Sequence, residues 1–227
     1  MAPRSRCIHV KNQSTKRFEM ATFDINNLKI TTAGLMPNPD QRTIVFIDID
    51  DVLCLTPTLN TTQVLAALAG DETVDAAYVW AEIFYQHAVE NLRQLNEEFR
   101  PWYVISSSWT LHLTKEQLIA TFRATGMQFV AENLHQHWCT PRDDDSYRLV
   151  EIEAWLDLHR WRGTRLLGPA PFVIIDDVLS GPSLLGSHLE EHAVFCEASG
   201  GFLFPQLRAA RGILSRQIRP WETNREI

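Results

Sequence analysis

Two short apolar segments of the chain end in clusters of carboxylates. "IVFI" is followed by Asp48, Asp50 and Asp51, and "FVII" is followed by Asp176 and Asp177. Asp48 and Asp50 lie two residues apart, so their side chains leave an extended chain on the same side. Like charges held this closely repel and raise one another's pKa unless a cation neutralises them. Because Mg²⁺ is the common cation of such sites, we expect a magnesium centre here.

A third apolar segment ends in serines. "VI" is followed by Ser106, Ser107 and Ser108, whose hydroxyl and backbone N–H groups suit phosphate oxygens. Each motif alone has an ordinary structural explanation, such as a helix cap or a polar loop. The occurrence of all three, each at the end of an apolar run, is much more specific for a phosphate site.

The elements that position these motifs are short apolar strands alternating with helices. The pattern predicts strands at 43–49, 102–105, 172–175 and 193–196. It predicts helices at 62–69, 74–99 (one long helix or two), 114–125, 147–159 and 205–218. This order is typical of an α/β, Rossmann-like three-layer sandwich with a mainly parallel sheet. Functional groups gather at the carboxyl ends of strands in such sheets, so neighbouring strands would bring the motifs into one crevice.

Composition limits the class of protein. The 227 residues are 45% hydrophobic and 22% charged, which is typical of a globular protein with one core. No apolar run approaches the roughly 20 residues of a membrane span, and no apolar signal region or CxxC pair is present. We therefore expect a cytoplasmic protein without a membrane partner. The net charge of −7 argues against nucleic-acid binding over the whole surface but not against a local basic groove.

We expect a weakly structured extension at 1–42, a catalytic domain at 43–218 and a short tail at 219–227. Both ends of the chain are rich in basic residues: Arg4, Arg6, Lys11, Lys16 and Arg17, then Arg208, Arg211, Arg216, Arg219 and Arg225. Solvated termini would explain this distribution, and so would a phosphate-rich partner.

The order of motifs resembles that of the haloacid dehalogenase-like (HAD) superfamily. Its members have an apolar strand ending in DxD, a strand ending in Ser or Thr, a later basic residue, and a strand ending in acidic residues. "IVFIDIDD", "WYVIS" and "FVIIDD" correspond to the three strands, over about 43–177. "VISSSW" and "RLVEIEAWLDLH" are most similar to the small HAD domains of bacterial RNA-repair (Swiss Army Knife) proteins. The resemblance implies a Rossmann-like fold and Mg²⁺-dependent phosphatase activity.

The resemblance also implies roles for the acidic residues. Asp48 corresponds to the nucleophile that forms an aspartyl-phosphate, and Asp50 to the general acid/base. Asp176 corresponds to a metal ligand, together with Asp48 and the backbone carbonyl of Asp50. Asp177 would bind the metal through water or orient its neighbours.

Ser106 corresponds to the donor to the substrate phosphate, with Ser107 beside it. The basic residue of the family is usually Lys, but no suitably placed Lys exists in this chain. Arg148, at the start of a predicted helix, is our choice for this role, and Arg142 is the alternative. A guanidinium can hold a phosphate and a carboxylate in one planar fork.

Several other polar and aromatic residues are expected to have structural roles. Asp51 stands where many family members have Gly, and we expect its side chain to point outward. Trp109 is expected in the core or at its edge. His112, His135 and His137 have no regular ligand spacing, so no metal site is predicted there.

Between Leu55 and Pro101 there is room for a small cap-like insertion, around 56–73, but not for a folded cap domain. The crevice should therefore be open and admit a phosphate on a large molecule, such as a polynucleotide end. The main prediction is a Mg²⁺-dependent phosphomonoester hydrolase. The alternatives are a phosphatase of small metabolites or nucleotides, a phosphotransferase, and a catalytically silent phosphate-binding module.

Overall fold

The computed structural model describes residues 42–142, 146–159, 161–162, 165–166 and 170–218. The predicted extension, apart from Arg42, and the predicted tail lie outside the described residues. The basic residues of these two segments, apart from Arg42, therefore lie outside the described residues as well.

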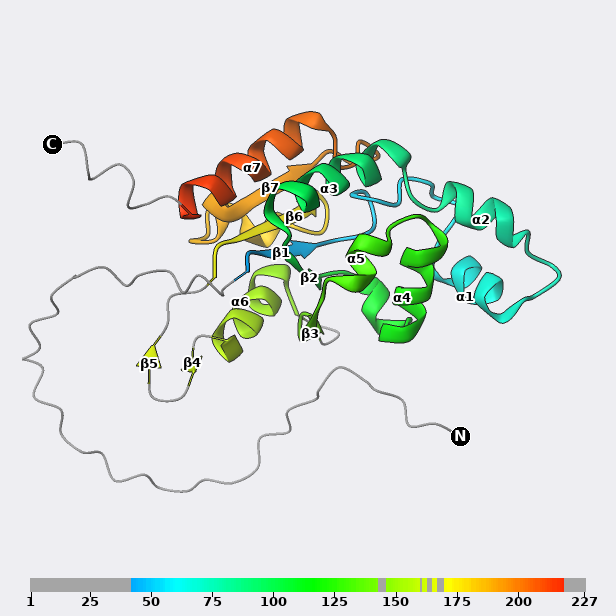
Figure 1. The fold of residues 1–227 in the computed structure, drawn as a ribbon, viewed down its shortest axis with the longest axis horizontal. Helices are drawn as coiled ribbons and strands as arrows, with labels where there is room; N and C mark the ends of the chain where they lie inside the picture. The colour runs from blue at the N-terminus through cyan, green and yellow to red at the C-terminus, as the bar shows by residue number, and fades with distance from the viewer. Residues whose placement is uncertain (1–41, 143–145, 160, 163–164, 167–169, 219–227) are drawn as a thin grey trace, which may run out of the picture.

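The chain alternates strands and helices in the order predicted for an α/β fold (Figure 1). The strands are β1 Ile44–Ile47, β2 Trp102–Ile105, β3 Leu134–Cys139, β4 Trp161–Arg162, β5 Arg165–Leu166, β6 Phe172–Asp177 and β7 Ala193–Cys196. The α-helices are α1 Thr61–Ala69, α2 Ala76–Glu82, α3 Gln86–Phe99, α4 Lys115–Ala124, α5 Gln128–Glu132, α6 Arg148–His159 and α7 Phe204–Ile218.

The main sheet has five strands in the order β3-β2-β1-β6-β7, and every pairing in it is parallel. β4 and β5 form a separate antiparallel pair. The predicted α/β class with a parallel sheet and no large cap domain is confirmed. β1 is central, so its two ladders and both of its faces are covered, which explains its continuous apolar sequence.

The two faces of the sheet are buried by different helices. Val45 and Ile47 of β1 belong to a large core with side chains of α1–α5 and α7. Ile44 and Phe46 point to the opposite face and pack in a second core against α6. Figure 1 shows α3 and α7 on one side of the sheet and α6 on the other. These layers make the three-layer sandwich.

Two helices begin at a capping box. The Asn60 side chain accepts the Thr62 amide at 2.8 Å, and the Asn60 backbone N–H donates to Gln63 Oε1 at 3.1 Å, which starts α1. Thr114 and Gln117 do the same for α4. These local signals satisfy backbone amides that would otherwise lack partners.

The segment 74–99 forms two helices in succession, α2 and α3, which is one of the two alternatives predicted, and no cap domain is inserted between β1 and β2, as expected. α1, in the predicted cap-like insertion, buries Val64 and Ala67 in the main core. β3 is not among the four predicted strands, yet it forms one edge of the sheet. In the part of the chain described, no helix has the length and apolar character that a membrane crossing requires.

Candidate active site

The three predicted motifs meet at the carboxyl edge of the sheet. β1 is in register with both β2 and β6, so the residues after Ile47 and its two partners lie at one level: Asp48, Ser106 and Asp176. A pocket of about 240 Å³ opens at this edge. Its lining residues are Asp48, Asp50, Asp51, Ser108, Arg142, Arg148, Asp177, Leu179 and Ser180.

Three buried carboxylates have the arrangement of a cation site. One oxygen each of Asp48, Asp176 and Asp177 lies within 4.8 Å of the other two. The Ser180 hydroxyl is 2.8 Å from Asp48 Oδ2 and 2.7 Å from Asp176 Oδ1, and it also contacts Asp177 Oδ2. A hydroxyl has one proton to donate and ionised carboxylates have none, so it cannot satisfy all three. These residues therefore fit a hard divalent cation, which would supply the missing positive charge.

Arg148 is the buried cation of the site, with 5% of its surface exposed. Its Nε donates to Asp176 Oδ2 at 2.6 Å, and its second terminal nitrogen lies 3.3 Å from Asp48 Oδ2. Its first terminal nitrogen donates to Glu151 Oε2 at 3.1 Å. Burial alone would lower the pKa of Arg148, but the three carboxylates together raise it. The guanidinium therefore stays charged and ties the α6 start to the sheet edge.

One guanidinium does not balance the buried negative charge. Burial, and then the charge of Asp176, raise the pKa of Asp48 well above its usual range, although Arg148 opposes the shift. Burial also raises the pKa of Asp176. Two carboxylates that share one guanidinium in a dry site repel each other. Without a further cation, the negative charge of the buried carboxylates therefore exceeds the positive charge of Arg148.

This imbalance makes a prediction for Asp176→Asn. In metal-free protein the substitution should raise the thermal midpoint by about 2–4 °C, the shift produced by roughly 1 kcal/mol in a chain of this size. Repulsion is removed, while Arg148 keeps Asp48 and Glu151 as partners. With saturating Mg²⁺ the wild type should gain more stability than the variant. Calorimetry in chelator and in Mg²⁺ measures both. A lower metal-free midpoint in the variant would make Asp176 a structural partner of Arg148 instead.

Arg142 lies farther out in the same pocket. Its Nε is 3.5 Å from Glu151 Oε1, and its side chain is 25% exposed. Glu151 is buried and also accepts the Ser146 hydroxyl at 2.8 Å. Both candidate arginines are therefore held by one carboxylate, but Arg148 is the one that contacts Asp48.

Asp50 has different surroundings from the acidic cluster. Its Oδ1 accepts the Trp109 indole N–H at 2.9 Å, and its Oδ2 lies 3.4 Å from the Ser108 hydroxyl. Trp109 is 2% exposed, so its ring is fixed by packing. The carboxylate is thus oriented at the pocket wall beside Asp48 without belonging to the group of three.

The serines after β2 offer donors to an anion. Ser106 is buried, and its hydroxyl has no hydrogen-bond partner among the described residues. Ser107 is also buried and caps the short 3₁₀ helix Ser108–Leu111. A buried hydroxyl without a partner costs free energy unless a ligand satisfies it. A phosphate oxygen at the strand end would do so.

Asp51 adopts a conformation that favours glycine. Its φ is +56°, in the left-handed region, which Asp tolerates better than most residues. Its Oδ1 accepts the Ser199 amide at 2.8 Å, which joins the β1 loop to the segment after β7. The Asp51 side chain was expected to point outward; it lies at the rim of the pocket, where it accepts this hydrogen bond.

Three groups of the site were not predicted from the sequence: Ser180, Glu151 and the indole of Trp109. Ser180 follows Asp176 by four residues, in the turn after β6. Glu151 follows Arg148 by three residues, a spacing that places these two side chains on one face of α6. Trp109 was assigned to the core, which is correct, but its N–H also holds Asp50. The helical spacing from Arg148 could have indicated Glu151. Nothing in the sequence indicated that Ser180 or the Trp109 indole belongs to the site.

Comparison with known proteins identifies the family. Residues 44–207 match the family described as the HAD domain in Swiss Army Knife RNA repair proteins. The chain belongs to this family. Curated proteins and solved structures gave no significant match. The predicted resemblance is confirmed, and membership in a HAD family indicates a HAD-type hydrolase.

Proposed function

We propose that this HAD domain is a Mg²⁺-dependent phosphomonoester hydrolase that uses Asp48 as its nucleophile. The supporting observation is the convergence on Asp48 of two further buried carboxylates and the buried Arg148, at the end of the central strand. Asp50 lies two residues away on the same pocket. A silent phosphate-binding module would need Ser106 and Arg148 but not Asp50.

The proposed reaction has two displacements. A carboxylate oxygen of Asp48 attacks phosphorus, and the bond from phosphorus to the leaving oxygen breaks. Asp50 gives its proton to that oxygen, so the product leaves as a neutral hydroxyl. Asp50, now ionised, then takes a proton from a water that attacks the aspartyl-phosphate. Phosphate is released, and both carboxyl groups return to their starting states.

The other residues bind and orient. Ser106 and Ser107 donate to phosphate oxygens, and Arg148 compensates their negative charge next to Asp48. Trp109 and Ser108 keep the Asp50 carboxyl turned toward the leaving group. Asp48, Asp176, Asp177 and the backbone carbonyl of Asp50 would hold Mg²⁺, which neutralises phosphoryl charge and lets an anionic nucleophile approach.

We propose a phosphate on a large molecule, such as a polynucleotide end, as the substrate. The pocket is small and no cap domain formed by the described residues covers it, so a free metabolite would remain partly exposed to water. The name of the family places its relatives among RNA repair proteins. A phosphotransferase would use the same first step with another acceptor.

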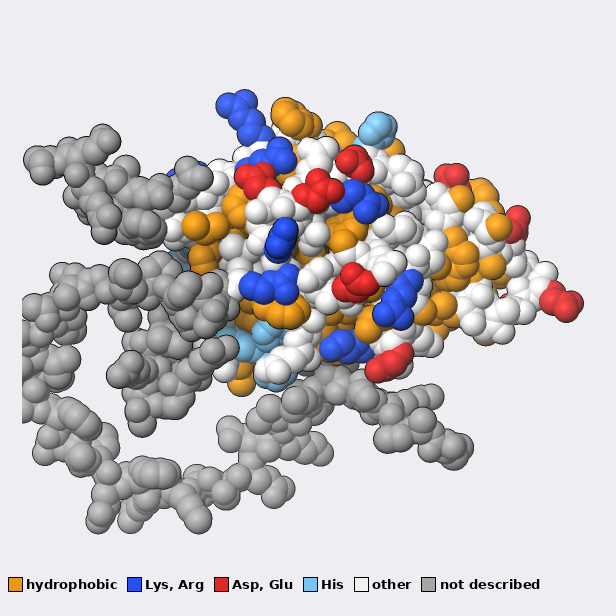
Figure 2. Space-filling model, in the orientation of Figure 1, with side chains coloured by type: hydrophobic (Ala, Val, Ile, Leu, Met, Phe, Trp, Pro, Cys, Tyr) orange, Lys and Arg blue, Asp and Glu red, His pale blue; other side chains and the backbone are white. Residues whose placement is uncertain are grey.

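Charge on the surface limits where a polynucleotide would bind. Figure 2 shows basic and acidic side chains interspersed over α3 and α7, without a continuous basic patch on this face. Arg211 of α7, for example, is paired with Glu98 at 2.6 Å. Contacts to a phosphodiester chain are therefore expected around the pocket, where the Arg142 side chain is 25% exposed, and not on the α3–α7 face.

The substrate proposal is tested by comparing kcat/KM values in Mg²⁺. Terminally phosphorylated RNA and DNA oligonucleotides should exceed sugar and nucleoside phosphates by tenfold or more, about 1.4 kcal/mol of transition-state preference. Asp48→Asn serves as the control for contaminating phosphatases. If the small compounds are preferred by that factor, the large-substrate proposal is wrong. If no phosphate ester is hydrolysed but phosphate binds, the silent-module alternative holds.

A further inference from the structure

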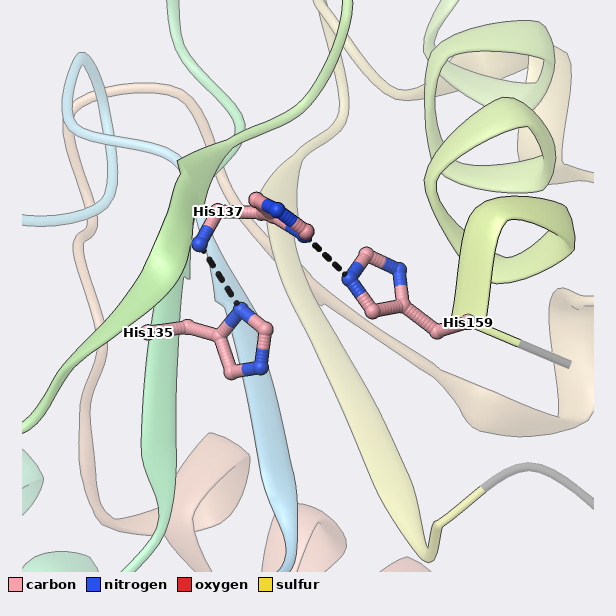
Figure 3. A group of neighbouring side chains, drawn as sticks. All are labelled: His135, His137 and His159. Atoms are coloured by element: carbon pink, nitrogen blue, oxygen red, sulfur yellow. Dashed lines mark hydrogen bonds between the residues drawn. The ribbon is translucent and has the colours of Figure 1, made fainter. Parts of the chain in front are cut away.

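Three histidines meet at a place remote from the acidic pocket. His135 and His137 lie on β3, and His159 is the last residue of α6 (Figure 3). Arg148, at the first residue of α6, belongs to the acidic pocket. His159 is eleven residue steps farther along the helix, about 16 Å at a rise of 1.5 Å per residue. The histidine cluster is therefore distinct from the candidate active site.

The strand geometry explains why two of the rings are neighbours. His135 and His137 are two residues apart on an extended strand, so both side chains point to the same side. His135 and His137 have ring centroids 5.7 Å apart, and each lies about as close to His159, at 5.2 and 4.9 Å. One nitrogen from each ring lies within 4.8 Å of the others. Ligand atoms around a tetrahedral Zn²⁺ are separated by roughly 3.3 Å. The most distant nitrogens must therefore move closer together, whereas His137 Nδ1 and His159 Nε2, which are 2.7 Å apart, must separate slightly.

Hydrogen bonds leave a lone pair of His159 facing His137. His159 Nδ1 lies 2.5 Å from the Trp155 carbonyl oxygen, which can only accept, so this nitrogen has the proton. Nε2 is then unprotonated and lies 2.7 Å from His137 Nδ1. A metal-binding histidine usually has this arrangement, with its second nitrogen donating to a carbonyl that fixes the ring.

Trp155 holds the helix and the strand of the cluster together. Its indole N–H donates to the His137 carbonyl at 2.9 Å, and its ring stacks on His159 at 3.6 Å between centroids. His159 is thus fixed by a stack and a hydrogen bond, whereas His137 is exposed and its ring is held by the hydrogen bond to His159. His135 Nδ1 accepts a hydrogen bond from the His137 backbone amide at 3.1 Å. This hydrogen bond must break for Nδ1 to bind a metal ion.

We propose that His135, His137 and His159 bind a transition metal ion of the Zn²⁺ type and so join the edge strand β3 to α6. Imidazole nitrogen suits Zn²⁺, Ni²⁺ and Cu²⁺, whereas Mg²⁺ prefers oxygen, so the two sites select different metals. The proton between His137 and His159 moves to the exposed Nε2 of His137, and the metal takes both facing lone pairs. Water fills the fourth position of the exposed site.

The test is a calorimetric titration of the full chain with Zn²⁺ in excess Mg²⁺, which occupies the acidic pocket. We expect one equivalent of Zn²⁺ to bind. His137→Ala and His159→Gln should each weaken binding at least tenfold. His87→Ala, at an exposed histidine outside the cluster, is the matched control and should leave it unchanged. Asp176→Asn should also leave it unchanged.

Thermal unfolding gives a second readout. Zn²⁺ at about one hundred times its Kd should raise the midpoint of the wild type by roughly 5–10 °C, and that of His137→Ala by far less. The position of His137 is exposed, so this variant is expected to fold. No Zn²⁺ binding, or binding that is lost in Asp176→Asn but kept in the histidine variants, would overturn the proposal.

Discussion

Asp48→Asn should lower kcat about 10⁴-fold or more while the protein stays folded. An amide does not attack phosphorus, and effects of this order follow when a catalytic nucleophile is removed. The replacement has the same shape and can still accept the Ile49 amide, which bonds Asp48 Oδ1 at 2.8 Å. It also removes one of the repelling carboxylates, so stability should not fall. Steady-state kinetics in saturating Mg²⁺ and a thermal melt measure the two quantities.

Asp51→Asn is the matched control for this substitution. Asp51 is a neighbouring carboxylate on the same pocket, and Asn can both adopt its positive φ and accept the Ser199 amide. Its kcat should stay within a few-fold of the wild type. Activity of Asp48→Asn close to that of Asp51→Asn would show that Asp48 is not the nucleophile.

Arg148→Met is expected to have the largest effect on stability. Among the described residues, Arg148 is the only buried cation that contacts Asp48. Its removal leaves the carboxylates of Asp48, Asp176 and Glu151 without their shared guanidinium. Loss of one partner of a buried ion pair typically costs about 3–5 kcal/mol. Added Mg²⁺ should recover more stability in this variant than in the wild type, because it neutralises two of the same carboxylates. Activity should fall roughly 10²-fold or more.

Arg142→Met tests whether the effect belongs to Arg148. Arg142 is partly exposed and contacts Glu151 at 3.5 Å, so its loss should be far milder in both urea unfolding and kcat/KM. If Arg142→Met proves the more damaging substitution, the basic role belongs to Arg142 and the assignment of the α6 start is wrong.

The fold could be predicted because its central strands are buried on both faces. "IVFI", "WYVI" and "FVII" are continuous apolar runs that only a covered sheet accommodates. The edge strand β3, "LHQHWC", is polar on its exposed positions and has no such run. Its pairing with β2 is a tertiary effect that local sequence does not encode. No metal site was predicted at His135 and His137 because their third neighbour, His159, comes from another element.

The residues of the candidate site that could be predicted are those that directly follow the apolar part of a strand. Asp48, Ser106 and Asp176 could be placed together because parallel strands in register end at one edge. Ser180 and Trp109 reach the site through a loop and a 3₁₀ turn, whose directions depend on packing. Gly181 shows how tight that loop is, since a Cβ there would lie 2.9 Å from the Asp177 carbonyl oxygen. Such close approaches have no signature in a single sequence.

The most direct test of the proposed mechanism is a search for the phosphorylated intermediate on Asp48. Asp50→Asn is mixed with an aryl phosphate, whose leaving group departs without protonation, so the first displacement proceeds and water activation fails. The reaction is quenched in acid and digested, and the peptides are analysed by mass spectrometry. The expected result is one phosphoryl group on the peptide of Asp48, absent when Asp48 is also changed to Asn. Release of the aryl alcohol with no phosphopeptide, or with the phosphoryl group on another residue, would contradict it.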